Sequence, residues 1–151
     1  EEKAKLARSV GADEAIIYTK QNFENEVMKI TDGQGIQVVY DSVGKSTFDQ
    51  SVNCLGPRGY LVLYGQASGP VPNIDPQMLN SKGSLFLTRP SLGHYTLTRS
   101  EILDRANTIF QWVDSGDLSV RIHATLPLSE ASEAHRLLAS RTTTGKIVLV
   151  P

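Results

Sequence analysis

Two short segments of the sequence place a glycine directly after an apolar run. Tyr40-Asp41-Ser42-Val43-Gly44 follows the apolar residues 36–39, and residues 60–65 repeat this arrangement, ending in Tyr64 and Gly65. A buried strand that ends in a glycine turn is typical of nucleotide-binding sheets, whose ligands lie at the carboxyl ends of the strands. Glycine leaves room there for a ligand. We therefore predict that these two strand ends form the floor of a cofactor cleft.

A cation and a phenol near the start of the chain form a second candidate site. Tyr18 ends a predicted strand, residues 14–18, and Lys3 begins the helix predicted beside it. Together they are able to bind the 2′-phosphate of a ribose, since an ammonium group binds phosphate as a compact charge. The pattern alone favours two solvated surface residues instead.

Residue types that support metal or covalent chemistry are sparse. Cys54 lies on a predicted helix with no histidine at a useful spacing and is interpreted as a small buried hydrophobe. His94, His123 and His135 are scattered and lack the spacing of zinc ligands. Asp41 is interpreted as a strand-end residue that bonds nearby backbone rather than as a general base. The sequence therefore predicts no catalytic residue and no metal site.

The bulk composition is that of a globular protein of one ordinary domain's length. Of the 151 residues, 40% are hydrophobic and 21% are charged, and the formal net charge is -1. Such a balance gives no overall field that would attract nucleic acid or an anionic membrane. The single cysteine excludes an internal disulfide and is typical of a reducing compartment, so we predict a cytoplasmic protein.

Hydrophobic periodicity predicts alternating helices and strands up to residue 64. Helices are expected at residues 3–10, 23–30 and 46–55, and strands at 14–18, 36–41 and 60–64. This alternation is typical of a parallel sheet with helices on both faces. Further strands are expected at residues 84–88, 121–126 and 145–150, and helices at 98–116, where Thr98 begins a capping box, and 129–138.

The usual dinucleotide fingerprint is not found in this sheet. Gly33-Gln34-Gly35 precedes a strand instead of following one, and position 38 is Val, so we interpret the segment as a turn. Residues 1–7 read as the middle of a helix without a cap. We therefore expect a fragment, with a partial Rossmann-type parallel sheet whose first strand and phosphate loop are missing.

Four stretches resemble the quinone oxidoreductase (zeta-crystallin-like) branch of the medium-chain dehydrogenase/reductase superfamily. They are residues 11–18, 39–44, 83–92 and 140–146, and the resemblance runs along essentially all 151 residues. It implies the C-terminal half of such an enzyme. Residues 1–90 would be a partial NADP-binding Rossmann domain, and residues 91–151 the C-terminal segment of the catalytic domain.

The same resemblance implies a zinc-independent reductase that transfers a hydride from NADPH to a quinone and forms a homodimer, the fragment alone being inactive. It implies that Lys3 and Tyr18 grip the 2′-phosphate of NADPH. The other implied cofactor contacts are Ser42, Val43, Gly44, Tyr64, Gly65, Ser68, Thr88 and Arg141.

Two alternative functions stay open. One is an NADPH-dependent reductase of the same superfamily that acts on an enone or an enoyl thioester. The other is a non-catalytic crystallin-like or RNA-binding protein. The near-zero net charge and the absence of an aromatic and basic stripe argue against nucleic acid as a partner.

Overall fold

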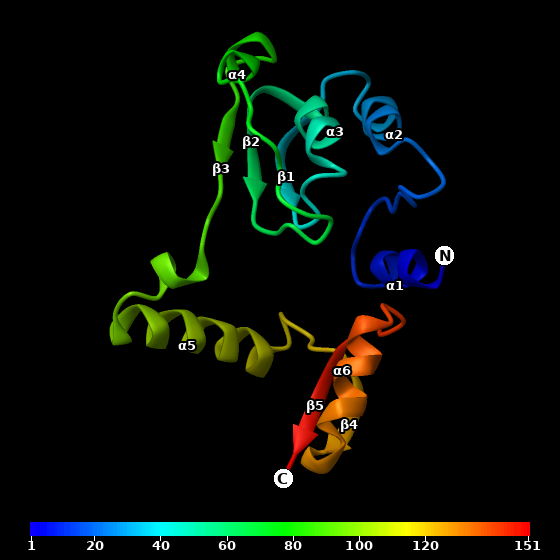
Figure 1. Cartoon of the computed structure of the whole chain (residues 1–151), viewed down its shortest axis with the longest axis vertical. Coiled ribbons are helices and arrows are strands. Elements are labelled where there is room, and N and C mark those ends of the chain that lie inside the picture. Colours follow the sequence, from blue (N-terminus) through cyan, green and yellow to red (C-terminus); the bar gives the residue numbers. More distant parts are fainter. The chain divides into compact units, whose positions relative to one another are not determined.

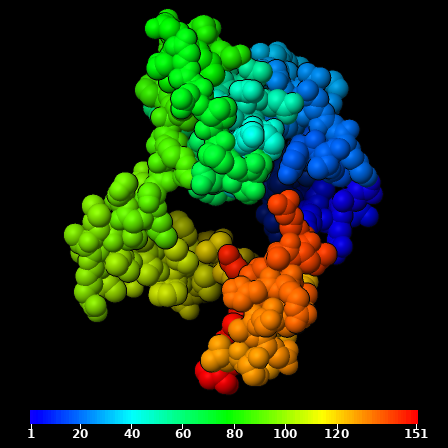
Figure 2. Space-filling model, viewed as in Figure 1, coloured from blue at the N-terminus to red at the C-terminus, as the bar shows by residue number.

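The computed structural model describes residues 1–151, which form two compact units, Glu1–His94 and Tyr95–Pro151 (Figure 1). In the space-filling view, the blue to green segments of the first unit pack closely against one another (Figure 2). None of the helices has both the length and the apolar character that crossing a membrane requires.

The first unit is built on a three-stranded parallel sheet with the order β1-β2-β3. β1 spans Ile36–Asp41, β2 spans Leu55–Leu63 and β3 spans Phe86–Thr88. Asp41 pairs with Leu63, so β1 and β2 end at the same edge of the sheet. Three consecutive parallel strands in unbroken order form one half of the doubly wound order 3-2-1-4-5-6. The sheet is therefore part of a Rossmann-type sheet, as predicted.

The strand predicted at residues 14–18 is wrong. Residues 14–17 are irregular, and Tyr18 begins a turn. A strand exists only where a neighbouring strand bonds to it. No strand of the three-stranded sheet pairs with residues 14–18.

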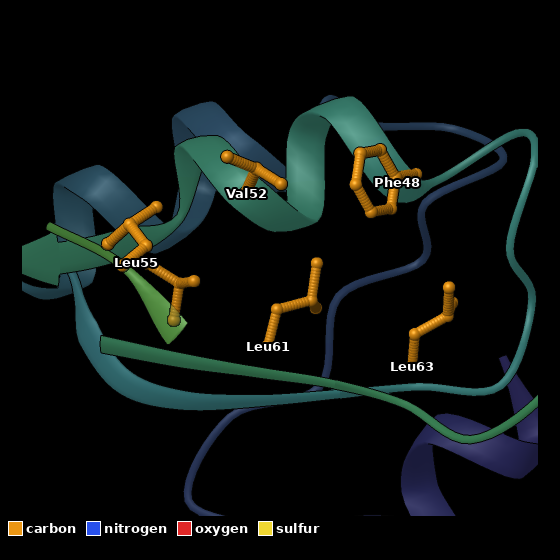
Figure 3. Close-up of a cluster of buried hydrophobic side chains, with 6 residues drawn as sticks. Phe48, Val52, Leu55, Leu61 and Leu63 are labelled. Carbon is orange, nitrogen blue, oxygen red and sulfur yellow. The ribbon is translucent and has the colours of Figure 1, made fainter. Parts of the chain in front are cut away.

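The core of the first unit lies between the sheet and α3, Phe48–Asn53 (Figure 3). Its buried members are Phe48, Val52, Leu55, Leu61, Leu63 and Leu85. Alternate residues of a strand point to opposite faces. Leu61 and Leu63 accordingly lie in this core, whereas Tyr60 and Tyr64 are exposed. A slip of one residue would reverse this pattern, so burial against α3 fixes the register of β2.

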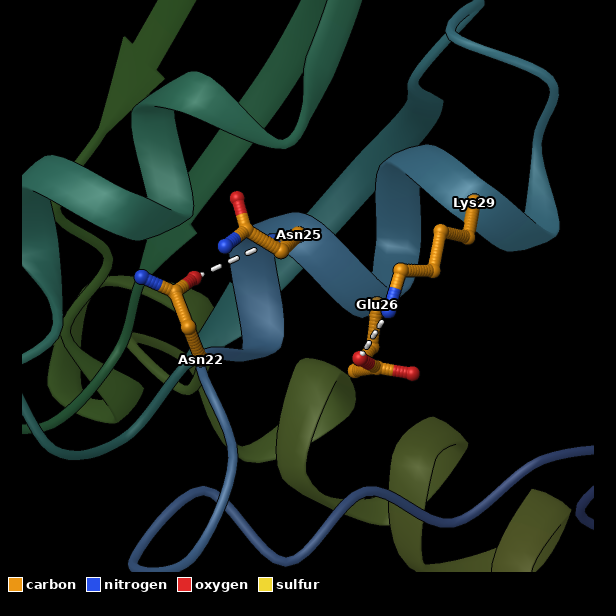
Figure 4. A network of polar contacts seen from close by, with 4 residues as sticks. All are labelled: Asn22, Asn25, Glu26 and Lys29. Carbon is orange, nitrogen blue, oxygen red and sulfur yellow. Dashed lines mark hydrogen bonds and ion pairs between the residues drawn. The ribbon is translucent and has the colours of Figure 1, made fainter.

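The remaining helices of the first unit are short and mostly stabilised by local contacts. They are α1 at Glu2–Ser9, α2 at Phe23–Ile30 and α4 at Gln77–Ser81. A 3₁₀ turn at Leu92–Tyr95 spans the boundary between the first and second units. The side chain of Asn22 caps α2 by accepting a hydrogen bond from the Asn25 N–H at 3.0 Å. Lys29 pairs with Glu26 at 2.7 Å on the next turn (Figure 4). Residues 23–30 thus form the predicted helix.

β2 begins earlier than predicted. Residues 56–59, which precede the predicted strand 60–64, belong to β2, where the pairing with β1 shifts register. Arg58 there has φ +61°, a left-handed conformation that is uncommon outside glycine. Residues 56–59 therefore form an irregular start of β2 and not a separate turn.

The second unit is a β-α-β arrangement preceded by a long helix. α5 spans Arg99–Ser115, β4 spans Ile122–Pro127, α6 spans Ala131–Ala139 and β5 spans Lys146–Val150, with a 3₁₀ turn at Leu128–Glu130. β4 and β5 pair in parallel. The predicted capping box of α5 is confirmed, because the Thr98 hydroxyl accepts from the Glu101 N–H and the Glu101 carboxylate accepts from the Thr98 N–H.

Candidate functional site

The ends of β1 and β2 are joined by backbone hydrogen bonds. The N–H groups of Tyr64 and Gly65 both donate to the Asp41 carbonyl, at 2.9 and 3.2 Å. The chain that leaves β1 therefore lies beside the chain that leaves β2. We call residues 42–46 and 64–69 together the strand-end floor.

The two segments of the strand-end floor are bonded to each other over their whole length. The Ala67 N–H donates to the Ser42 carbonyl at 3.2 Å, and the Lys45 N–H donates to the Gly69 carbonyl at 3.1 Å. Between them, the Ser68 N–H donates to the Val43 carbonyl at 2.8 Å. These bonds hold the predicted contact residues of both strand ends in one surface.

The hydroxyl of Ser68 reinforces this junction. It donates to the Val43 carbonyl at 2.7 Å and accepts from the Ser46 N–H at 3.0 Å. The family resemblance implied that Ser68 contacts a cofactor. In the structure its hydroxyl already joins the two halves of the floor, so the hydroxyl contributes positioning whether or not it also meets a ligand.

Behind the floor, the carboxylate of Asp41 is buried and fully hydrogen-bonded. Its Oδ1 accepts from the N–H groups of Val43 and Gly44 at 2.7 and 2.9 Å. The hydroxyls of Thr47 and Ser51 each donate to Oδ2 at 2.8 Å. The interpretation of Asp41 as a strand-end residue that bonds nearby backbone is confirmed.

These hydrogen bonds control the ionisation of Asp41. Burial alone raises the pKa of a carboxyl group, because it disfavours the charged form. Hydrogen bonds from Gly44, Thr47, Ser51 and Val43 outweigh that effect, and the pKa of Asp41 is lowered from its ordinary value of 3.8. All four donors are neutral groups, so Asp41 stays an anion at neutral pH without a cationic partner.

Two glycines of the floor are required by close backbone contacts. A Cβ added at Gly65 would lie 2.4 Å from the carbonyl oxygen of Ser42. A Cβ at Gly44, where φ is +86°, would lie 2.9 Å from the carbonyl oxygen of Gly69. Ligand access was the expected reason for these glycines. The structure shows an additional reason, which is the contact between the two segments.

The predicted site residues fall into distinct groups. Those that the structure brings together on the strand-end floor are Ser42, Val43, Gly44, Tyr64, Gly65 and Ser68. Thr88 ends β3 and pairs with Val62 of β2, so it lies at the same edge of the sheet. Arg141 belongs to the second unit, where it has φ +59°.

Tyr18 lies near the floor, on its β1 side. It lines a cavity of about 260 Å³ together with Ser42 and Val43, and its side chain is half exposed. Lys20, in the turn that begins at Tyr18, pairs with Glu1 at 2.8 Å. This ion pair brings the start of the chain, and with it the first turn of α1 that carries Lys3, to the turn that carries Tyr18.

Sequence reasoning missed Thr47 and Ser51 as partners of Asp41. A signal was present, since residues four apart share one face of a helix. Thr47 directly precedes Phe48, and Ser51 directly precedes Val52; Phe48 and Val52 face the core. Two hydroxyls beside an apolar helical stripe indicate a buried polar partner, but only the fold identifies it as Asp41.

The structure offers no metal centre and no activated nucleophile. No group of three or more His, Cys, Asp or Glu residues lies close enough to hold a metal ion. Cys54 is buried, as predicted, and burial together with the nearby Glu24 carboxylate raises the pKa of its thiol to about 11. The reactive thiolate is therefore scarce at neutral pH.

Comparison with known proteins assigns the chain to a family. A family model described as "Zinc-binding dehydrogenase" matches residues 10–149. The chain is 46% identical over 150 residues to a quinone oxidoreductase of Pseudomonas aeruginosa, covering 99% of this chain and 46% of that protein. It is 45% identical over 154 residues to a 2-haloacrylate reductase of Burkholderia, covering 100% of this chain and 46% of that protein.

A solved structure supports the same assignment. The Escherichia coli quinone oxidoreductase complexed with NADPH superimposes with a TM-score of 0.91 at 39% identity, covering 99% of this chain and 47% of that one. The chain belongs to the zinc-binding dehydrogenase family, in the quinone oxidoreductase branch of the medium-chain dehydrogenase/reductase superfamily. It spans about half the length of the relatives that it matches.

The family description mentions zinc, but the residues of this chain do not fit a zinc site. The single cysteine is buried, and zinc requires about four ligands arranged around one point. The three histidines form no such group with other ligands. No step of the chemistry is therefore assigned to a metal bound by these residues.

The close approach at Gly65 leads to a first prediction. Gly65→Ala should lower the free energy of unfolding by about 1–3 kcal/mol, because the new methyl group must push the Ser42 backbone aside. Urea unfolding of the chain measures this loss. Gly93→Ala is the matched control, since a Cβ there meets nothing closer than the Ser91 Oγ at 3.7 Å. Equal unfolding free energies of the two variants would contradict the close contact between Gly65 and the Ser42 backbone.

The lowered pKa of Asp41 leads to a second prediction. The ionised carboxylate stabilises the fold at pH values above its ordinary pKa of 3.8, and this contribution is lost as the pH falls through the lower folded-state pKa. The variant Asp41→Asn lacks this stabilising contribution at every pH. The difference in unfolding free energy between the wild type and this variant should be constant from about pH 7 to about pH 5.

Below pH 3.8 that difference should shrink. Urea unfolding of both proteins across this range gives the comparison. A difference that widened on acidification would show that Asp41 has a raised pKa in the folded chain and would refute the hydrogen-bonding account.

Proposed function

We propose that this chain is the C-terminal half of an NADPH-dependent quinone oxidoreductase, which transfers a hydride from NADPH to a quinone. The observation that carries the proposal is the strand-end floor, in which the ends of β1 and β2 meet at one edge of a parallel sheet. Ligands of open α/β sheets bind at that edge. The quinone oxidoreductase relatives support the reaction.

NADPH is the proposed cofactor, and Tyr18 and Lys3 would hold its 2′-phosphate. The cavity that Tyr18 lines is smaller than the pockets of about 300–1,000 Å³ that hold whole ligands. It suits one part of a dinucleotide, such as a ribose with its phosphate. The Escherichia coli relative, which was solved in complex with NADPH, supports this choice.

In this proposal the chain binds and orients the cofactor, and the cofactor supplies the hydride when it is bound. The floor brings no reactive thiolate and no group of metal ligands to the cofactor. Asp41 is occupied by its own hydrogen bonds and has no free proton to give. We accordingly name no catalytic residue.

The other parts of the proposal concern the rest of the chain. Residues 1–90 would be the cofactor-binding part and residues 91–151 part of the catalytic domain, with Thr88 near the crossing and Arg141 as a late cofactor contact. The division of the chain at His94 and Tyr95 into two compact units is compatible with this assignment. We further propose a zinc-independent, cytoplasmic homodimer that is inactive as the fragment alone.

Cofactor preference tests the proposal. In the complete protein, kcat/KM with a naphthoquinone should be higher for NADPH than for NADH. Removing Lys3 and Tyr18 together, as Lys3→Ala with Tyr18→Phe, should lower this preference by about two orders of magnitude, since each loses a hydrogen bond to a charged group. Lys5→Ala on the same helix is the control and should keep the preference.

Two results would count against this account in different ways. Equal use of NADH and NADPH by the wild type would remove the role of Lys3 and Tyr18. Failure to turn over a quinone with either cofactor would reject the proposed reaction itself.

An activated alkene is the second candidate substrate. The 2-haloacrylate reductase of Burkholderia supports it, because that enzyme is named for the reduction of a haloacrylate. Parallel turnover of a naphthoquinone and an alkenal by the complete protein separates the two substrates. The main proposal expects a higher kcat/KM for the naphthoquinone, and the reverse order would favour the alkene.

A further inference from the structure

We propose that Asp41 is a positioning residue of the cofactor site, whose buried carboxylate fixes the turn Ser42–Gly44 against the loop Tyr64–Gly69 without binding the cofactor itself. This inference rests on the proposed function and adds the residue that keeps the strand-end floor in its binding shape. Nothing about the reaction requires a carboxylate at this place.

The hydrogen-bonding capacity of Asp41 is fully used inside the protein. An ionised carboxylate offers about four acceptor sites. Oδ1 accepts from two backbone N–H groups and lies 3.0 Å from the Thr47 hydroxyl, and Oδ2 accepts from the hydroxyls of Thr47 and Ser51. The residue is only 4% exposed. A cofactor hydroxyl would therefore find no free acceptor, and cofactor phosphates would be repelled by the charge.

Val43 and Gly44, whose N–H groups donate to Asp41, are each held from two sides. The Val43 N–H is bound by Asp41, and the Val43 carbonyl is bound by the N–H and hydroxyl of Ser68. The Gly44 N–H is bound by Asp41, and a Cβ at Gly44 would meet the Gly69 carbonyl. Loss of the carboxylate would free two N–H groups at the centre of the floor and loosen its contact with the loop.

Ser51 provides a comparison within the same network. Its hydroxyl bonds only Oδ2, the oxygen that faces α3, whereas the turn is bonded by Oδ1. Ser51→Ala should weaken the fold and leave the turn in place. Asp41→Ala should weaken the fold and also release the turn. The two variants thus separate positioning from general stability.

Kinetics of the complete protein give the functional test. Asp41→Ala should raise KM for NADPH about tenfold, because binding must then also order the released turn, while kcat changes less than about twofold, as expected when only binding is lost. Asp41→Asn, which keeps an acceptor oxygen for the turn, should recover part of the loss. Ser51→Ala and the exposed-residue control Asp49→Asn should both leave KM within about twofold.

Amide hydrogen exchange of the 151-residue chain gives a test that needs no cofactor. In Asp41→Ala the amides of Val43, Gly44 and Ser68 should exchange at least about tenfold faster relative to the core amides of β2, because they lose the restraint on the turn. In Ser51→Ala these ratios should stay unchanged.

The outcomes distinguish this inference from the proposed function. If the wild type uses no NADPH, the proposed function fails and the claim about the cofactor fails with it. If the wild type uses NADPH but KM rises equally in Asp41→Ala and Ser51→Ala, Asp41 acts only through stability. Equal exchange ratios in those two variants would likewise overturn the positioning role.

Discussion

The buried carboxylate of Asp41 is the interaction on which the candidate site depends. It ends β1, begins the turn through the N–H groups of Val43 and Gly44, and ties both to α3 through Thr47 and Ser51. Burying an unpaired charge costs several kcal/mol, so the donors that surround the carboxylate stabilise the arrangement. One acidic side chain therefore joins the strand, the turn and the helix that covers the core.

A second layer of contacts turns this local arrangement into a surface. The loop after β2 bonds to the turn after β1 by backbone groups and by the Ser68 hydroxyl, at distances that leave no room for side chains at Gly44 and Gly65. Most of the donors and acceptors involved are backbone atoms. The floor is consequently preformed, which lowers the ordering cost when a ligand binds.

The sequence predicted what depends on local chemistry. The capping box at Thr98, helix 23–30 and the ends of β1 and β2 follow from side chains a few residues apart. Residues 14–18 have the composition of a strand, but a strand exists only through pairing with a distant segment. The same limit explains Thr47, Ser51 and the crowding at Gly65, since each depends on which backbone the fold brings alongside.

The central claim is that residues 42–46 and 64–69 bind NADPH as one surface. Peptide-resolved hydrogen exchange of the complete protein, with and without saturating NADPH, tests it most directly. The account predicts that NADPH slows exchange in both segments together. Slower exchange elsewhere in the protein, with both segments unaffected, would contradict it.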